Sequence, residues 1–225
     1  MGRSQNKTKH MKYYSIKTEG KWFSRVPKED QDSQVKDGRV VRHWEYAGTP
    51  GTTLGWFKDE LKGRVTGAEV RALGDDNFFS IYLDSGDVAQ FKLYESNFLS
   101  LAQSLANIDL HSEVVFQAGL NPKKSWTNKK SGKVIVPTSL YIKQNDQVLA
   151  QSWPYDADER WFTGLPKPTL VEKFGRTSRD SSNMDAAFDV ELDNFIGRVE
   201  AFADGSPSTP STATLTESGE EDIAF

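Results

Sequence analysis

Hydrophobic residues in the middle of the chain alternate with polar ones, switch to a helical spacing, and then alternate again. The first part of this pattern predicts a long strand over Leu61–Leu73 that bends at Gly63 and Gly67, as strands of small barrels do. Two further strands, Phe78–Asp84 and Asp87–Tyr94, are separated by a Ser-Gly pair that is typical of a tight hairpin turn. The pattern therefore predicts three consecutive β-strands.

A helical stripe follows these strands. Its apolar residues recur at helical spacing after a capping Ser96 or Asn97, and they are Phe98, Leu101, Ala102, Leu105 and Ile108. Further strands are expected near residues 113–118 and 134–143, with an additional one over 147–153. The order β-β-β-α-β-β predicts a mainly β chain built around a five-stranded barrel of the oligonucleotide-binding (OB) type. An ordinary β-sandwich is the alternative.

The chain is expected to have three parts. Residues 1–20 are polar and basic and are predicted to be a flexible N-terminal segment, and residues 21–202 are predicted to hold the OB-type domain. After connectors over 154–181, that domain ends in a second helical stripe formed by Phe188, Leu192, Phe195, Val199 and Phe202. This helix either docks on the barrel or forms a dimer seam, so homo-oligomerisation stays open. Residues 203–225 predict a disordered linker with an acidic tip.

Charge is divided unevenly along the chain. The whole sequence has a net charge of −4, but residues 181–225 contain ten acids and one cation, Arg198, and so carry −9. The remaining 180 residues therefore carry +5. A basic body with an acidic end is typical of proteins that bind an anionic polymer through the body.

The sequence lacks the residues that several classes of chemistry require. The sequence has no cysteine, so disulfides, thiol nucleophiles and thiolate metal sites are excluded. Its three histidines are scattered, and it has neither a phosphate-binding glycine loop nor a dinucleotide fingerprint. No apolar run approaches the ~20 residues that span a bilayer. We expect a non-enzymatic protein without cofactor, metal or membrane partner, located in the cytoplasm, or in the host cytoplasm if it is encoded by a phage.

One face of the predicted hairpin carries aromatic and polar residues together. Phe78, Ser80 and Tyr82 alternate with apolar residues on the first strand, and Gln90, Lys92 and Tyr94 do so on the second. Bases of single-stranded nucleic acid stack on such rings, and the phosphates seek cations. The alternative is that Phe78, Tyr82 and Tyr94 are covered by the N-terminal segment or the C-terminal helix.

The expected loop between the fourth and fifth strands is basic. Residues 121–133 contain five lysines around a single tryptophan and no acid. This composition predicts nucleic-acid contacts by Lys123, Lys124, Trp126, Lys129 and Lys130, because the loop occupies a position that OB-folds use for binding. The alternative is a solvated hairpin whose ring folds back on the barrel. Weaker candidates are Lys62 and Arg64, the pair Trp22-Phe23 with Arg25, and Arg42 with Trp44.

The chain ends in Glu220-Glu221-Asp222-Ile223-Ala224-Phe225. This tip resembles that of the bacterial single-stranded DNA-binding proteins, in which a short acidic run precedes Ile-Pro-Phe, and of phage-encoded proteins of the same function. Ala224 departs from the usual proline. The resemblance implies that the tip binds replication, recombination and repair enzymes, such as a polymerase, helicase, primase or nuclease. A tail that only solubilises the protein is the alternative, but exposed apolar residues such as Ile223 and Phe225 do not contribute to solubility.

Together these features predict a protein that binds and protects single-stranded DNA without strong sequence preference. Three rival functions remain open from the sequence. They are a structural or assembly protein of a virion, an RNA-binding OB module, and a metal-dependent nuclease.

Overall fold

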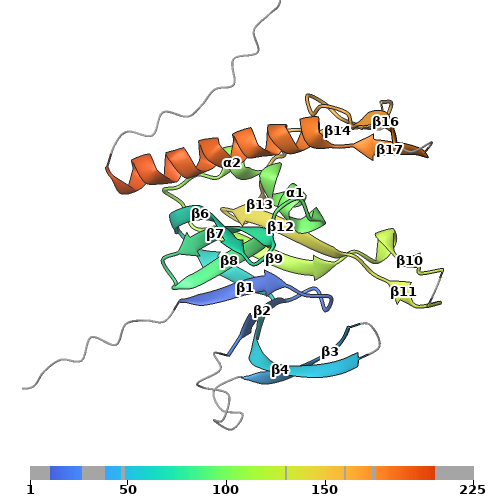
Figure 1. Ribbon diagram of the computed structural model, residues 1–225. Coiled ribbons are helices and arrows are strands. Elements are labelled where there is room, and N and C mark those ends of the chain that lie inside the picture. The colour runs from blue at the N-terminus through green and yellow to red at the C-terminus, as the bar shows by residue number, and fades with distance from the viewer. Residues whose placement is uncertain are drawn as a thin grey trace, which may run out of the picture.

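The computed structural model describes residues 11–26, 39–46, 49–129, 131–159, 161–173 and 176–205. The chain is mainly β, and its strands form two larger sheets and three two-stranded hairpins (Figure 1). Residues 1–10 and 206–225 lie outside the described part, and so does the acidic tip at 220–225. No helix within the described ranges is both long and apolar enough to cross a membrane.

The first sheet has seven strands in the order β3-β4-β2-β1-β8-β7-β6. Their bounds are β1 Lys12–Ile16, β2 Trp22–Arg25, β3 Val40–Tyr46, β4 Thr49–Lys58, β6 Val65–Leu73, β7 Asp76–Leu83 and β8 Asp87–Lys92. Most neighbours are antiparallel, but β1 pairs in parallel with β8. Residues 12–16, expected in a flexible N-terminal segment, are therefore an inner strand of this sheet, which corrects that expectation.

The second sheet has four strands in the order β13-β12-β9-β5, which are Gln147–Val148, Thr138–Gln144, Val114–Leu120 and Glu60–Gly63. Three small hairpins complete the β structure: β10 Trp126–Thr127 with β11 Val134–Ile135, β14 Tyr155–Asp156 with β15 Trp161–Phe162, and β16 Thr169–Lys173 with β17 Arg176–Asp180. The last two lie in the segment that was expected to be connectors. The helices are α1 Ser96–Ala102 and α2 Ser182–Ala203, with 3-10 turns η2 Leu105–Asn107 and η3 Pro122–Lys124.

The bend predicted near Gly63 links the two sheets. β5 pairs with β9 in the second sheet, and β6 pairs with β7 in the first, so one nearly continuous strand belongs to both. At the bend the backbone N–H of Arg64 donates to Asp84 Oδ1 at 3.0 Å, and the register shifts between Val65 and Gly67. A sharply bent first strand was therefore predicted correctly.

The predicted order of three strands, a helix and two strands is present as β5–β6, β7, β8, α1, β9 and β12. Among the described strands, however, no barrel closes: β12 pairs with β9 and β13, and the edge of β8 that faces away from β7 pairs with β1. The physical reason is the N-terminal strand β1. Its parallel pairing with β8 already satisfies the backbone groups of β8 with which a fifth barrel strand would otherwise pair. The sequence gives β1 no local signal for this distant partner.

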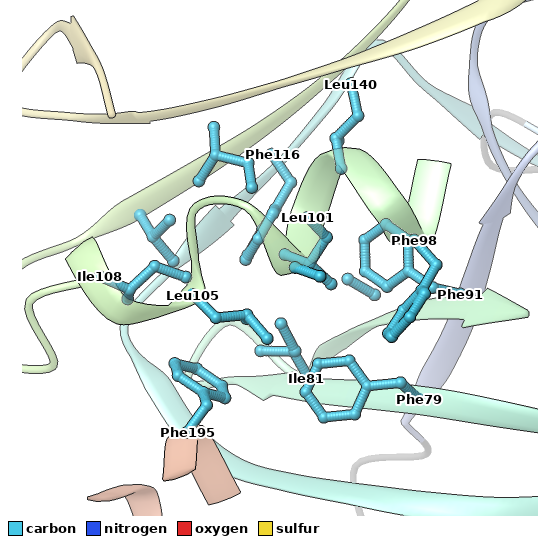
Figure 2. Close-up of a cluster of buried hydrophobic side chains, with 14 of the residues drawn as sticks. Phe79, Ile81, Phe91, Phe98, Leu101, Leu105, Ile108, Phe116, Leu140 and Phe195 are labelled. Carbon is cyan, nitrogen blue, oxygen red and sulfur yellow. The ribbon is translucent and has the colours of Figure 1, made fainter. Parts of the chain in front are cut away.

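The hydrophobic core lies between the two sheets and the helices. Figure 2 shows its side chains converging from β7, β8, β9, β12, the α1–η2 segment and α2. All five residues of the first predicted helical stripe are buried. They are divided between α1, η2 and the residue after it, because the helix ends at Ala102 and continues as a 3-10 turn.

Helix α2 docks on its own chain, along the opposite side from the β3–β4 ribbon (Figure 1). Phe188, Leu192, Phe195 and Val199 are buried beneath it. Arg198 fastens the helix: Nη1 donates to the carbonyls of Leu105 at 3.2 Å and Ala106 at 3.0 Å, and Nη2 donates to that of Ile108. The apolar face of α2 is thus packed within the chain, as in the docking alternative that the sequence had left open.

Candidate nucleic-acid interface

A hollow of about 780 Å³ opens on the part of the first sheet formed by β1 to β4 and β8. We call it the basic groove. Its described lining residues are Met11, Lys12, Tyr13, Ser15, Lys17, Phe23, Ser24, Arg25, Arg39, Arg42, Trp44, Thr53, Trp56 and Gln90. They include five cations and four aromatic residues and no acid.

The groove exists because the sheet curls. In the strand order, β4 and β2 separate β3 from β1, so a flat sheet would keep β3 away from the β1–β2 turn. Yet Arg42 on β3 reaches that turn, with Nε 2.9 Å from Glu19 Oε1 and Nη2 donating to Thr18 Oγ1 at 3.4 Å. The β3–β4 ribbon, at the bottom of Figure 1, thus returns toward the strands that precede it and encloses the space.

Strand alternation on β1 divides its residues between groove and core. Met11, Tyr13 and Ser15 line the groove, whereas Tyr14 and Ile16 pack in or against the core. Lys12 is the exception, because its long side chain reaches Trp56 in the groove. Lys17 continues the groove series beyond the end of the strand. The Lys-Tyr-Tyr-Ser-Ile-Lys stretch therefore forms the floor of the groove and one wall of the core at the same time.

Trp44 is held as a preorganised stacking surface. Its Nε1 donates to Thr53 Oγ1 at 2.9 Å, and its ring lies against Gly51, directly across the β3–β4 pair. A Cβ at residue 51 would collide with the ring, so glycine is needed there for the indole to lie close to the backbone. Trp44 remains 38% exposed as a residue and lines the groove, which leaves surface for a base to stack.

The other rings of the groove lie beside cations. Lys12 Nζ is 4.1 Å and the Arg39 guanidinium 5.5 Å from the centroid of the Trp56 ring. The Arg42 guanidinium lies 5.9 Å from the centroid of Phe23, which itself packs on Phe57 at 5.0 Å. A cation that lies over an aromatic face is attracted to the ring electrostatically. The same cations offer charge to phosphates, and the same rings offer apolar faces to bases.

The surroundings of Lys17 in the groove shift its pKa. Burial lowers the pKa of its ammonium group, and the nearby charge of Arg42 lowers it further, while Glu19 and Glu95 act in the opposite direction. The described lining of the groove holds five cations and no acid, so it carries an excess of positive charge. Such an excess attracts an anionic ligand.

A smaller hollow of about 230 Å³ adjoins the groove, and Ser15, Lys17 and Gln90 line both. Phe78 and Lys92, two residues predicted to bind nucleic acid, lie here together with Glu95. The predicted face of the β7–β8 hairpin is therefore one end of a longer surface. Its larger part belongs to β1 through β4, outside the segment that the sequence pattern had indicated.

Tyr82 and Tyr94 are partly covered, as the alternative interpretation held. Tyr82 donates to Glu69 and lies 3.4 Å, oxygen to oxygen, from the Tyr13 hydroxyl, so the N-terminal strand covers it. Tyr94 donates to Asp189 of α2 at 2.7 Å, and burial together with this bond raises its pKa to about 12. These bonds tie both phenols to the protein, although the Tyr94 ring is still 43% exposed.

Three predicted cations already have acidic partners. Lys62 lies 2.8 Å from Glu113, and Arg64 lies 3.1 Å from Asp84. Lys92 lies 2.9 Å from Asp76 and 3.6 Å from Glu95. A phosphate would have to compete with these carboxylates, so the three are weaker phosphate ligands than the sequence suggested.

The lysine-rich loop is an exposed hairpin built from η3, β10 and β11. Lys123, Lys124 and Lys129 are exposed, and Trp126 is 52% exposed rather than folded back on the sheets. Lys130 lies outside the described residues. Lys133 reaches Glu45 at the end of β3 at 3.3 Å, so the hairpin approaches the ribbon that encloses the groove.

The structure brings together two of the weaker sequence candidates and adds residues that the sequence analysis missed. Phe23 with Arg25, and Arg42 with Trp44, meet in the groove, whereas Trp22 is fully buried and donates from Nε1 to the Phe116 carbonyl at 2.9 Å. The residues missed are Lys12, Lys17, Arg39 and Trp56. The alternation of residues after Lys12 could have indicated a strand there. The residues that these four meet in the groove, however, are too distant in the sequence to be predicted from a local pattern.

The described residues hold no group of three or more His, Asp or Glu side chains placed to bind a metal ion. The comparisons add no relative: no protein-family model, no curated protein and no solved structure matches the chain.

Proposed function

We propose that this protein binds single-stranded DNA in the basic groove, without strong sequence preference, and protects it during replication, recombination or repair. The observation that carries the proposal is the lining of the groove, with five cations, four aromatic residues and no acid among its described residues. Phosphates are attracted by the cations, and unpaired bases stack on rings for about 1–3 kcal/mol each. Every base has a π face, so the binding is tolerant of sequence.

The order of elements supports an OB-type arrangement within the domain. The bent strand β5–β6, the β7–β8 hairpin, α1 and the β9–β12 pair follow one another as the elements of an OB-fold do. In that fold the ligand lies across the second and third strands, which correspond to β7 and β8. We propose that β1 to β4 extend this surface rather than replace it.

A fluorescence titration with a labelled poly-dT oligonucleotide tests the proposal. We expect tight binding at low salt that weakens steeply as salt rises, because each phosphate contact releases counterions. Removing the stacking ring by Trp44→Ala is expected to weaken binding about tenfold, equivalent to about 1.4 kcal/mol. The double variant Lys123→Ala with Trp126→Ala measures the contribution of the exposed hairpin separately.

Intact protein that fails to bind the oligonucleotide at low salt would contradict the proposal and favour a virion assembly role. A matched RNA oligonucleotide in competition decides between DNA and RNA, and incubation of the DNA with magnesium or manganese detects a nuclease. Tighter binding of the RNA, or cleavage of the DNA, would replace the proposed function by one of those rivals.

We further propose that the tip, Glu220-Glu221-Asp222-Ile223-Ala224-Phe225, recruits partner enzymes. Its apolar residues suit an apolar pocket, and its acids suit a basic rim around that pocket. The same acids can visit the basic groove of their own chain at high effective concentration, and DNA would displace them. Removal of residues 217–225 is therefore expected to raise DNA affinity at low salt. Unchanged affinity would rule out this competition but would leave recruitment of partners to be tested by direct binding.

A further inference from the structure

We infer that Lys17 and Arg42 form a binding subsite for one internal phosphate of the nucleic-acid strand, at the junction of the basic groove and the adjoining hollow. The inference rests on the proposed function. It specifies which part of the nucleic acid binds at this junction, namely a phosphodiester with a nucleotide on each side.

Lys17 stands at the junction and its backbone is fixed. It lines both hollows, which share its side chain together with Ser15 and Gln90. Its N–H donates to the Lys21 carbonyl at 3.0 Å, and its own carbonyl accepts from the Gly20 N–H at 2.8 Å. Gly20 has a φ of 69°, a left-handed conformation that favours glycine and closes this turn. The ammonium group is therefore presented from a tight turn and not from a loose end.

Arg42 reaches the same turn from the enclosing ribbon. Its side chain is 14% exposed, with Nε 2.9 Å from Glu19 and Nη2 bonded to Thr18. These contacts fix the guanidinium beside the turn that carries Lys17. Glu19 pairs with Arg42, and Glu95 lines the adjoining hollow and acts on Lys17, so a phosphate at the junction would compete with these two carboxylates.

The positive charge of Arg42 acts on Lys17. Burial lowers the pKa of the lysine most, Arg42 lowers it further, and Glu19 and Glu95 act in the opposite direction. A phosphate between Lys17 and Arg42 would form charge-assisted hydrogen bonds with both groups.

Rings lie on both sides of the junction. Phe78 lines the adjoining hollow, and Phe23 and Trp44 line the groove. A phosphate at Lys17 can therefore have one attached nucleotide directed toward Phe78 and the other toward Trp44. A mononucleotide or inorganic phosphate can use only part of this arrangement, so we expect either to bind far more weakly than a short oligomer.

The variant Lys17→Met tests the subsite, because it keeps most of the aliphatic stem and removes the charge. Lys21→Met is the matched control: Lys21 belongs to the same turn, pairs with Asp59 at 3.0 Å and lines neither hollow. With a dT oligomer we expect Lys17→Met to lose about tenfold in affinity. Its log–log salt slope should fall by about 0.7, the value for one phosphate of a single strand. Lys21→Met should change neither quantity by a comparable amount.

A measurement on the intact wild-type chain covers the case in which Lys17→Met does not fold. In protein with isotopically labelled lysine, NMR titration should show the pKa of Lys17 rising when the dT oligomer binds. Inorganic phosphate at the same total phosphate concentration should raise it much less.

The possible failures are distinguishable. If the wild type does not bind the oligomer in dilute buffer, the proposed function is wrong. If the wild type binds but Lys17→Met binds equally well with an unchanged salt slope, or if the titration of Lys17 ignores the oligomer, only the subsite is wrong.

Discussion

At the scale of single residues, the groove depends on a glycine as much as on its rings. Gly51 lets the Trp44 indole lie against the β-strand backbone while Thr53 holds its Nε1. Aromatic side chains that cover a glycine on the neighbouring strand are a recurrent device for fixing both strand register and ring position. The orientation of the ring thus depends on a residue that has no side chain.

Gly51→Ala is expected to displace Trp44 and weaken binding of a dT oligomer by about threefold to tenfold, part of the ~1–3 kcal/mol that a stacked base contributes. The measurement is a fluorescence titration, accompanied by a thermal unfolding curve. Gly197→Ala on α2 is the control, because a Cβ there meets no other atom within 4 Å. An unchanged affinity together with an unchanged tryptophan emission spectrum would contradict the assigned role of Gly51.

Tyr94 provides a prediction about alkaline pH. Its pKa rises from the ordinary 10.0 to about 12 through burial and the bond to Asp189. The folded state therefore holds the proton more tightly than the unfolded state does. The stabilisation is fully present below pH 10 and is lost as the pH approaches about 12.

Tyr94→Phe is accordingly expected to reduce the loss of stability between these two pH values, as measured by chemical unfolding at a series of alkaline pH values. The exposed Tyr141→Phe serves as the comparison. If the stability of Tyr94→Phe falls as steeply as that of the wild type, the hydrogen bond to Asp189 does not couple this tyrosine to folding.

At the scale of elements, α2 is joined to the rest of the chain by packing and by one polar residue. Arg198 supplies donors to three carbonyls in and beside η2, and burial lowers its pKa. Hydrogen bonds from an ionised guanidinium are stronger than those from a neutral donor, and at Leu105 the guanidinium adds to the bond from the Ile108 N–H at 3.2 Å.

Arg198→Ala is expected to lower the free energy of unfolding by about 2–4 kcal/mol, because three carbonyls lose charged donors. Chemical denaturation measures this effect. Lys167→Ala, which breaks the exposed ion pair with Glu159, is expected to cost under about 1 kcal/mol. Equal effects of the two substitutions would show that Arg198 does not fasten the helix.

Elements with a local signal were predictable from the sequence. The first helical stripe is buried but divided between α1, η2 and the residue after it, and four of the five residues of the second stripe are buried in α2. The bent strand and its hairpin lie where the alternation placed them. The parallel pairing of β1 with β8 joins residues more than 70 positions apart, so no local periodicity reports it. The same holds for the site: Phe78 and Lys92 were predictable from alternation, whereas the meeting of Arg42 with Glu19 depends on the curl of the sheet.

At the scale of the whole molecule, charge is divided between two sides. The basic groove lies toward the β3–β4 ribbon, and α2, which contains five acids and one cation, lies along the opposite side (Figure 1). An anionic strand is thus attracted to one side and repelled from the other. Such a division favours binding along the groove over wrapping around the molecule.

The indole N–H resonances of the six tryptophans test the central claim most directly. When a dT oligomer is added at low salt, we expect the resonances of Trp44 and Trp56 in the groove to shift. The buried Trp22, bonded to Phe116, and Trp161, bonded to Leu165, should stay in place. Shifts confined to Trp126 on the exposed hairpin, or the absence of any shift, would contradict binding in the basic groove.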